Sequence, residues 1–306
     1  MSEGTTPAAG VRVLAPAKLN LALEVVGRRD DGYHDIATVM TTIDLVDRVT
    51  LRPASELSVS LSGVYAAGID PEDDLAGRAA RALGEAAGRS PDVAIEVRKK
   101  IPSPGGLGGG SSDAAAVLRG LDALWGLGWS AERLAEVGAS VGSDVPFFVY
   151  GGVAHCTGRG ELVEPLKDLR EMRMLVLLPP VPAPPNKTAA LFGALHQHDF
   201  GDGHRVQRLA HRVARGAPPP TNDLRNVFEA VVERTNPELV AHYATYGRVA
   251  APGQLHLCGA GPAVFLLVTE RARVAVLRRE FEQVGATVFE ARTLPRAAAL
   301  AIEDAP

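Results

Sequence analysis

The stretch from Pro102 to Asp113 reads Pro-Ser-Pro-Gly-Gly-Leu-Gly-Gly-Gly-Ser-Ser-Asp and constrains this chain more than any other segment. Glycine loses more backbone entropy on folding than any other residue. A cluster of glycines therefore indicates unusual dihedrals or a close approach of the backbone to another group. This segment is called the glycine loop below.

The residues that follow the glycine loop, from Ala114 to Trp125, predict a helix with Val117, Leu121 and Leu124 on one stripe. One of Ser111, Ser112 and Asp113 is expected to cap the start of this helix. A flexible loop that runs into a helix N-terminus presents unpaired N–H groups and the positive end of the helix dipole. The pattern therefore predicts an anion site, for which phosphate is the commonest ligand.

Two well-known glycine loops can be tested against these residues. A P-loop needs a lysine before its Ser or Thr, but Gly110 precedes Ser111, and the chain has no lysine between Lys100 and Lys167. A dinucleotide loop needs a third glycine where this chain has Ser111, and it belongs to an early βαβ unit. The P-loop is excluded, and the dinucleotide loop is disfavoured.

Length and composition narrow the class of protein. A chain of 306 residues exceeds what one core usually organises, which predicts two domains. The net charge of −4 indicates no basic surface for nucleic acid or acidic lipid. The first residues lack the features of a signal peptide, and the longest apolar run, Met174 to Leu178, is too short to span a bilayer. Two cysteines argue against a disulfide framework or a cysteine metal site. We expect a cytoplasmic protein that needs no membrane and no nucleic acid.

Strand and helix patterns are mixed along the chain rather than strictly alternating, which favours an α+β fold over a doubly wound sheet. The first strands are expected within residues 11–26. There, period-two alternation of apolar residues projects the side chains of Lys18 and Asn20 from the same face, roughly 7 Å apart. Further strands are expected at 38–45, 47–52, 57–62, 93–98, 153–156, 161–164, 172–178, 254–258, 263–268 and 287–291. Helices are expected at 75–88, 114–125, 130–141, 188–196, 204–215, 224–234, 238–246 and 271–284.

The motif Pro-x-x-x-Gly-Leu-Gly-Gly-Gly-Ser-Ser, from Pro102 to Ser112, resembles the phosphate loop of the GHMP kinases. Four other blocks of this chain also resemble that family, and they occur along the chain in the family's order. They are Pro16-Ala17-Lys18-Leu19-Asn20, Asp31-Gly32-Tyr33-His34, Gly142-Ser143-Asp144-Val145-Pro146-Phe147-Phe148 and Gly259-Ala260-Gly261-Pro262. Their combination is similar to the branch whose substrate is 4-diphosphocytidyl-2-C-methyl-D-erythritol. The resemblance runs from about residue 13 to residue 268.

The resemblance implies a two-domain α+β GHMP kinase fold. Its N-terminal domain, residues 1–168, would be ribosomal-protein-S5-domain-2-like and carry the glycine loop, and residues 169–306 would form a ferredoxin-like C-terminal domain. The implied activity is ATP-dependent phosphorylation of the 2-hydroxyl of the cytidine-diphosphate sugar alcohol, a step of non-mevalonate isoprenoid biosynthesis. Another small-alcohol kinase of the mevalonate or homoserine type, or a nucleotide-binding sensor without catalysis, remain as alternatives.

The resemblance also implies roles for residues. Asp144 is the candidate base and Lys18 its catalytic partner, while magnesium would be carried with ATP rather than held in a protein cage. The acceptor would be bound by Asn20, Tyr33 and His34, with the tyrosine stacked on the cytosine, and by Gly259 and Gly261. Residues expected to bind ATP are Asp74, Lys99, Pro102, Ser103, Pro104, Gly105, Gly106, Leu107, Gly108, Gly109, Gly110, Ser111 and Ser112.

Each assignment has a plain structural alternative. Asp144 could only cap a helix that starts at Val145, and Lys18 could lie on a solvated sheet face. The segment from Gly259 to Gly261 is an ordinary turn or a second glycine loop that closes over the substrate. The histidines are expected to be solvated rather than metal ligands, since they lack a compact ligand spacing; they are His196, His198, His204 and His211.

Four positions depart from the pattern of the family. Pro104 replaces a small residue and removes one N–H group from the glycine loop. Asp74 stands where asparagine is frequent, and Ala183 and Ala260 stand where a hydroxyl residue is common. These departures bear on the contacts to adenine and on the fine geometry of the substrate.

Overall fold

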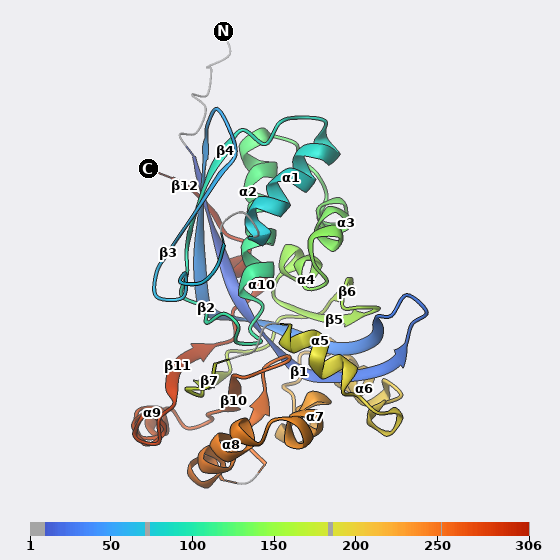
Figure 1. Ribbon diagram of the computed structural model, residues 1–306, viewed down its shortest axis with the longest axis vertical. Coiled ribbons are helices and arrows are strands. Elements are labelled where there is room, and N and C mark those ends of the chain that lie inside the picture. Colours follow the sequence, from blue (N-terminus) through green and yellow to red (C-terminus); the bar gives the residue numbers. More distant parts are fainter. Residues whose placement is uncertain (1–9, 71–73, 183–185, 252, 306) are drawn as a thin grey trace.

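The computed structural model describes residues 10–70, 74–182, 186–251 and 253–305, so Ala183 lies outside the described residues. Within these ranges the strands form two sheets (Figure 1). The first contains β1 (Val11–Arg28), β2 (His34–Pro53), β3 (Ser58–Ser62), β4 (Val93–Arg98), β5 (Val153–Thr157), β6 (Leu162–Pro165), β8 (Arg225–Asn226) and β12 (Ile302–Asp304). The second contains β7 (Arg173–Leu178), β9 (His256–Leu257), β10 (Val264–Leu267) and β11 (Thr287–Arg292).

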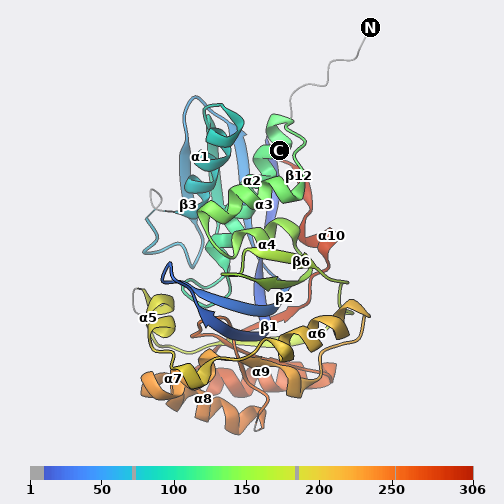
Figure 2. The ribbon, with the colours of Figure 1, turned by 90° about the vertical axis from the view of Figure 1, so that its right-hand side faces the viewer.

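Helices cover both sheets. The first group packs on one face of the large sheet, with α1 (Leu75–Ala87), α2 (Gly109–Trp125), α3 (Ala131–Val141) and α4 (Val145–Tyr150). The remaining helices are α5 (Lys187–Gly193), α6 (His204–Ala214), α7 (Phe228–Thr235), α8 (Pro237–Ala250), α9 (Val274–Gln283) and α10 (Arg296–Ala299). Figure 1 shows α7, α8 and α9 below β7, β10 and β11 of the second sheet, and Figure 2 shows the same helices below β1 and β2. The α+β class is thereby confirmed.

β1 and β2 are long enough to serve both halves of the molecule. They pair with each other along almost their whole length, and β2 also pairs with β5 in its first half and with β4 near its end. Ala17, Leu19 and Leu21 of β1 are fully buried in a core that also contains Val176 and Phe265 of the second sheet. The strand that carries Lys18 is therefore fixed between the two halves.

The division expected at residue 168 falls between β6 of the first sheet and β7 of the second. Two later segments return to the first sheet, because β8 pairs with β1 in parallel and β12 pairs with the start of β1. The pairing of β8 also explains why the helix expected at 224–234 begins only at Phe228. Similarly, the strands expected at 38–45 and 47–52 form the single strand β2.

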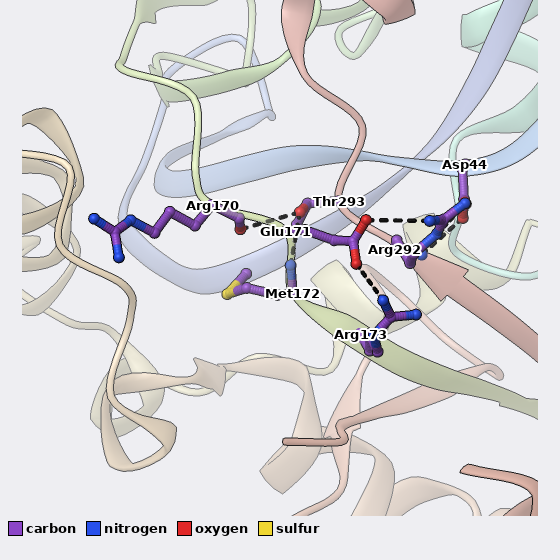
Figure 3. Close-up of polar contacts among 7 residues, drawn as sticks. All are labelled: Asp44, Arg170, Glu171, Met172, Arg173, Arg292 and Thr293. Carbon is purple, nitrogen blue, oxygen red and sulfur yellow. Dashed lines mark hydrogen bonds and ion pairs between the residues drawn. The ribbon is translucent and has the colours of Figure 1, made fainter. Parts of the chain in front are cut away.

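A polar cluster joins the two halves beside β2 (Figure 3). The backbone N–H of Arg292 donates to Asp44 over 2.7 Å, and the guanidinium of Arg292 bridges Asp44 and Glu171, each over 3.1 Å. The hydroxyl of Thr293 accepts from the N–H of Met172 over 3.0 Å. The two bonds to Asp44 hold β11 of the second sheet against β2 of the first. No helix in the described ranges is long and apolar enough to cross a membrane.

Candidate active site

A cavity of about 1290 Å³ lies among β1, β2, the glycine loop, the start of α4, α5 and the turn after β9. Its lining includes many of the residues that the sequence singled out, from segments far apart in the chain. They are Lys18, Asn20, Tyr33, His34, Pro104, Gly106, Gly108, Ser111, Asp144, Gly259 and Ala260. The fold thus brings residues of all five motif blocks together at one cavity.

Lys18 and Asn20 form the fixed end of this cavity. Both are about 5% exposed, and the ammonium of Lys18 donates to the Asn20 side-chain oxygen over 2.7 Å. The Asn20 amide donates in turn to Thr38 over 2.9 Å, and the Thr38 hydroxyl donates to the carbonyl of Ala22. The two side chains lie on the same face of β1, as the alternation predicted. The hydrogen bonds fix the orientation of both.

Asp144 faces Lys18, with 3.6 Å between its carboxylate oxygen and the ammonium nitrogen. It occupies the residue before α4, where the simple alternative expected it to cap the helix. Its side chain makes no capping bond, because the backbone there is already helical, with φ −84° and ψ −12°. About a third of the Asp144 side chain remains exposed to the cavity. The carboxylate is therefore available to a ligand.

The glycine loop is held by its carbonyl groups. Those of Gly105 and Leu107 accept from the N–H groups of Ala263 and Lys18, over 3.2 Å and 3.0 Å. Within the described residues, no backbone hydrogen bond uses the N–H groups of Gly106, Leu107 or Gly108. Donors without a partner beside a cavity form a site for an anion.

Gly106 shows why this loop requires glycine. It has a φ of +81°, and a Cβ placed there would lie 1.9 Å from the carbonyl oxygen of Cys258. Gly259 approaches from the other side, where a Cβ would lie 2.7 Å from the carbonyl oxygen of Gly106 and 3.0 Å from the Lys18 ammonium. The two glycine segments are therefore in backbone contact, and Lys18 lies at their junction.

The expected capping of the helix after the loop was wrong. α2 begins at Gly109, earlier than expected, and Gly108 precedes it with a φ of +72° and no capping side chain. Only glycine adopts this backbone readily, so the helix starts without a polar cap and its first amides stay free. Ser111, Ser112 and Asp113 lie inside the first turns, where Ser111 faces the cavity and the other two are fully buried.

Lys99, expected near adenine, is 2% exposed and surrounded by acids. Its ammonium contacts the carboxylate of Asp113 and that of Asp47, the latter over 2.5 Å. Burial works against its charge, but the two carboxylates outweigh burial and raise the pKa of Lys99. Asp47 also accepts from the N–H groups of Lys100 and Ile101. In this structure the ammonium lies under the glycine loop and supports the chain that enters it.

Asp74 is also buried, at 7% exposure, and acts as the N-cap of α1. Its carboxylate accepts from the N–H of Ala76 over 2.9 Å. Burial raises the pKa of Asp74, and the bond from Ala76 opposes that shift. Aspartate caps a helix as well as asparagine does, which accounts for the departure at this position.

Aromatic side chains line the other end of the cavity. The ring of His34 stacks on Phe192 of α5 with 5.1 Å between centroids, and Phe200 meets it edge-on at 6.0 Å. Burial and the nearby charge of Arg28 lower the pKa of His34, which favours the neutral imidazole. Tyr33 is 54% exposed, and the guanidinium of Arg159 lies 4.9 Å from its ring centre.

Several residues that line the cavity were not assigned to the site by the sequence analysis. Phe192 and Phe200 come from helical or loop segments whose pattern only indicated packing, and Arg159 follows a glycine in a turn between strands. Lys187 opens a helix that was expected one residue later. A motif search could not find them, because their neighbours in space are remote in sequence.

No group of three or more His, Cys, Asp or Glu side chains that could hold a metal occurs in the described ranges. The oxygen donors in the cavity include the Ser111 hydroxyl and the Asp144 carboxylate. A hard cation that keeps phosphate and water ligands needs only one or two such donors, so these residues fit nucleotide-bound magnesium.

Three comparisons bear on this geometry. The family model described as "GHMP kinases N terminal domain" matches residues 74–152. A protein of Dehalococcoides mccartyi named 4-diphosphocytidyl-2-C-methyl-D-erythritol kinase is 38% identical over 92% of this chain and 98% of its own length. One of the same name from Bacillus cytotoxicus is 39% identical over 86% of this chain and 89% of its own.

Two solved structures resemble this chain along most of its length. A crystal structure titled 4-(cytidine 5'-diphospho)-2C-methyl-D-erythritol kinase superimposes with a TM-score of 0.73 at 33% identity and covers 92% of this chain and 99% of its own. Homoserine kinase of Cytophaga hutchinsonii gives a TM-score of 0.75 at 14% identity, over 99% and 100% of the two chains. The second likeness concerns the fold alone.

Proposed function

The chain belongs to the 4-diphosphocytidyl-2-C-methyl-D-erythritol kinases, a branch of the GHMP kinases, and from this we propose that it phosphorylates the 2-hydroxyl of that cytidine-diphosphate sugar alcohol with ATP. The products are the 2-phosphate and ADP, in isoprenoid precursor biosynthesis. The observation that carries this proposal is the Lys18–Asp144 pair, which lies at a cavity walled on one side by the glycine loop and on another by aromatic rings.

Asp144 acts as the general base, which orients the acceptor hydroxyl and accepts its proton. Phosphoryl transfer asks a protein mainly for positioning and charge stabilisation, together with such a group. The Asp144 carboxylate is open to the cavity and makes no cap, so it is free for this task. Lys18 stabilises the charge that develops on the acceptor and phosphoryl oxygens, since Asn20 holds its ammonium in place.

ATP binds along the glycine loop. The free N–H groups from Gly106 onward and the start of α2 favour the phosphates, and Ser111 with Asp144 would contact the magnesium that accompanies them. When bound, the ion neutralises phosphate charge during transfer. The turn from Gly259 to Gly261 closes this end of the site against the loop.

The cytidine of the acceptor occupies the aromatic end. The exposed ring of Tyr33 offers a face for stacking, and the neutral His34 offers one donor and one acceptor to the edge of the base. We expect the enzyme to act in the cytoplasm on free metabolites.

The test is ATP consumption by the purified protein with 4-diphosphocytidyl-2-C-methyl-D-erythritol, mevalonate, homoserine or galactose as acceptor. The expected result is turnover with the cytidylylated acceptor alone. Equal turnover with mevalonate or homoserine would favour the broader small-alcohol kinase, and no turnover with any acceptor despite ATP binding would favour a sensor.

A further inference from the structure

Lys187, the first residue of α5, carries a positive charge that the reaction scheme above does not use. Its ammonium donates to the carbonyl oxygen of Gly261, and its side chain lines the cavity. The carbonyl is a neutral partner. Among the residues that the structure describes, no carboxylate forms an ion pair with Lys187.

A second cation lies nearby. The turn from Gly259 to Gly261 contacts Lys18 at its first residue and Lys187 at its last. Burial and the repulsion by Lys18 both lower the pKa of Lys187, and the thiol of Cys258 only partly opposes this shift. Lys18 has Asp144 as its counter-ion, whereas Lys187 has only a neutral carbonyl among the described residues. A partly buried cation without a counter-ion is costly, so Lys187 indicates an anionic ligand.

The position of Lys187 narrows the choice of anion. α5 also carries Phe192, which stacks on His34 at the aromatic end, five residues further along the helix. Five residues of α-helix rise about 7.5 Å. Lys187 therefore lies next to the wall of the cytidine end and also near Lys18, where the hydroxyl reacts. In the proposed acceptor, the group between cytidine and polyol is a diphosphate.

We propose that Lys187 binds the diphosphate of the acceptor and so positions its polyol against Lys18 and Asp144. This inference rests on the proposed function and adds a specificity residue to it: a diphosphate-bearing acceptor is recognised by its anion as well as by its base. Charge-assisted hydrogen bonds to phosphate are among the stronger polar contacts in proteins.

The test compares the affinities of cytidine 5'-diphosphate and cytidine by calorimetry, in the wild-type protein and in Lys187→Met, Lys187→Arg and Lys167→Met. Lys167 is an exposed lysine outside the cavity lining and controls for the lost charge. In Lys187→Met, diphosphate binding should weaken about 10- to 100-fold while cytidine binding stays unchanged. Lys187→Arg should recover most of the difference, and Lys167→Met should match the wild type.

Steady-state kinetics separate this proposal from its alternatives. The KM for the acceptor should rise in Lys187→Met with the KM for ATP unchanged. The assignment would be overturned if Lys187→Met left the ratio of the affinities for cytidine 5'-diphosphate and cytidine unchanged. A lower kcat with an unchanged KM for the acceptor would also overturn it. Failure of the proposed function is distinguishable, because the wild-type protein itself would then not turn over the cytidylylated acceptor.

Discussion

The carboxylate of Asp144 lies 3.6 Å from the ammonium of Lys18, although the two residues are 126 positions apart in the sequence. The substitution Asp144→Asn keeps the shape of the side chain but removes the proton acceptor. It should lower kcat at least about 100-fold and leave ATP affinity nearly unchanged. Initial rates and ATP titration measure the two effects. Asp92→Asn, an exposed change outside the cavity lining, is the control. Near-normal turnover in Asp144→Asn would return Asp144 to a structural role.

Gly106→Ala should damage the nucleotide site through geometry alone. The added Cβ would lie 1.9 Å from the Cys258 carbonyl oxygen, which must force the two glycine segments apart. The KM for ATP should rise at least about tenfold, and the melting temperature should fall by several degrees. Gly285→Ala is a matched control, since Gly285 has a similar φ of +86° with nothing within 4 Å of the new Cβ. It should cost only about 1–2 kcal/mol of stability. Equal effects of both variants would rule out the backbone contact as the cause.

Lys99→Met tests whether Lys99 supports the fold or contacts the nucleotide. The change leaves two buried carboxylates, those of Asp47 and Asp113, without their cation. The free energy of unfolding should fall by about 3–5 kcal/mol in urea titrations. Lys100→Met, at the exposed neighbouring position, should change it by less than about 0.5 kcal/mol. A Lys99→Met protein of normal stability with a raised KM for ATP would instead support the role at the adenine side.

Tyr33→Ala should mainly weaken binding of the acceptor. Loss of base stacking costs about 1–3 kcal/mol, which corresponds to a rise of roughly 5- to 150-fold in the acceptor KM, with a smaller change in kcat. Tyr33→Phe keeps the ring and should remain close to the wild type. Kinetics with varied acceptor at saturating ATP measure both variants, and an unchanged KM in Tyr33→Ala would remove the stacking proposal.

The pH dependence of acceptor capture should reveal the charge of Lys187. Burial first, and then repulsion by Lys18, lower the pKa of Lys187 to about 8. Cys258 also acts on Lys187, Tyr243 lies against Gly261, and Asp144 lines the same cavity. Burial raises the pKa of Cys258 and that of Tyr243 above their ordinary values. Because the lysine is cationic below its pKa, kcat/KM for the acceptor should fall as pH rises past about 8. In Lys187→Arg the guanidinium stays charged, so this fall should disappear from the pH profile. An identical profile in both proteins would contradict the prediction.

The glycine loop was readable from the sequence because its chemistry is local. Glycines at Gly106 and Gly108 are needed for positive φ values, and an adjacent helix start supplies amides, so residue type and spacing predict a phosphate site. The alternation in β1 likewise predicted that Lys18 and Asn20 share a face. The motif blocks then identified the family, which the comparisons confirmed.

Other features depend on contacts that no local pattern encodes. Whether Asp144 caps α4 or faces Lys18 was open until the backbone at that residue proved helical, which leaves its side chain without a capping bond. Lys99 was expected to bind ATP, yet its ammonium is enclosed because Asp47 and Asp113 reach it from two other segments.

The sequence by itself determined which groups this protein offers to a phosphate and to a base, because glycine dihedrals, strand alternation and motif spacing are short-range properties. Only the tertiary structure decided which charges remain free. Burial and pairing depend on residues brought together from distant segments. Lys99 is therefore neutralised by its neighbours, while Lys187 lines the cavity with the Gly261 carbonyl as its hydrogen-bond partner and with no ion pair to any described residue.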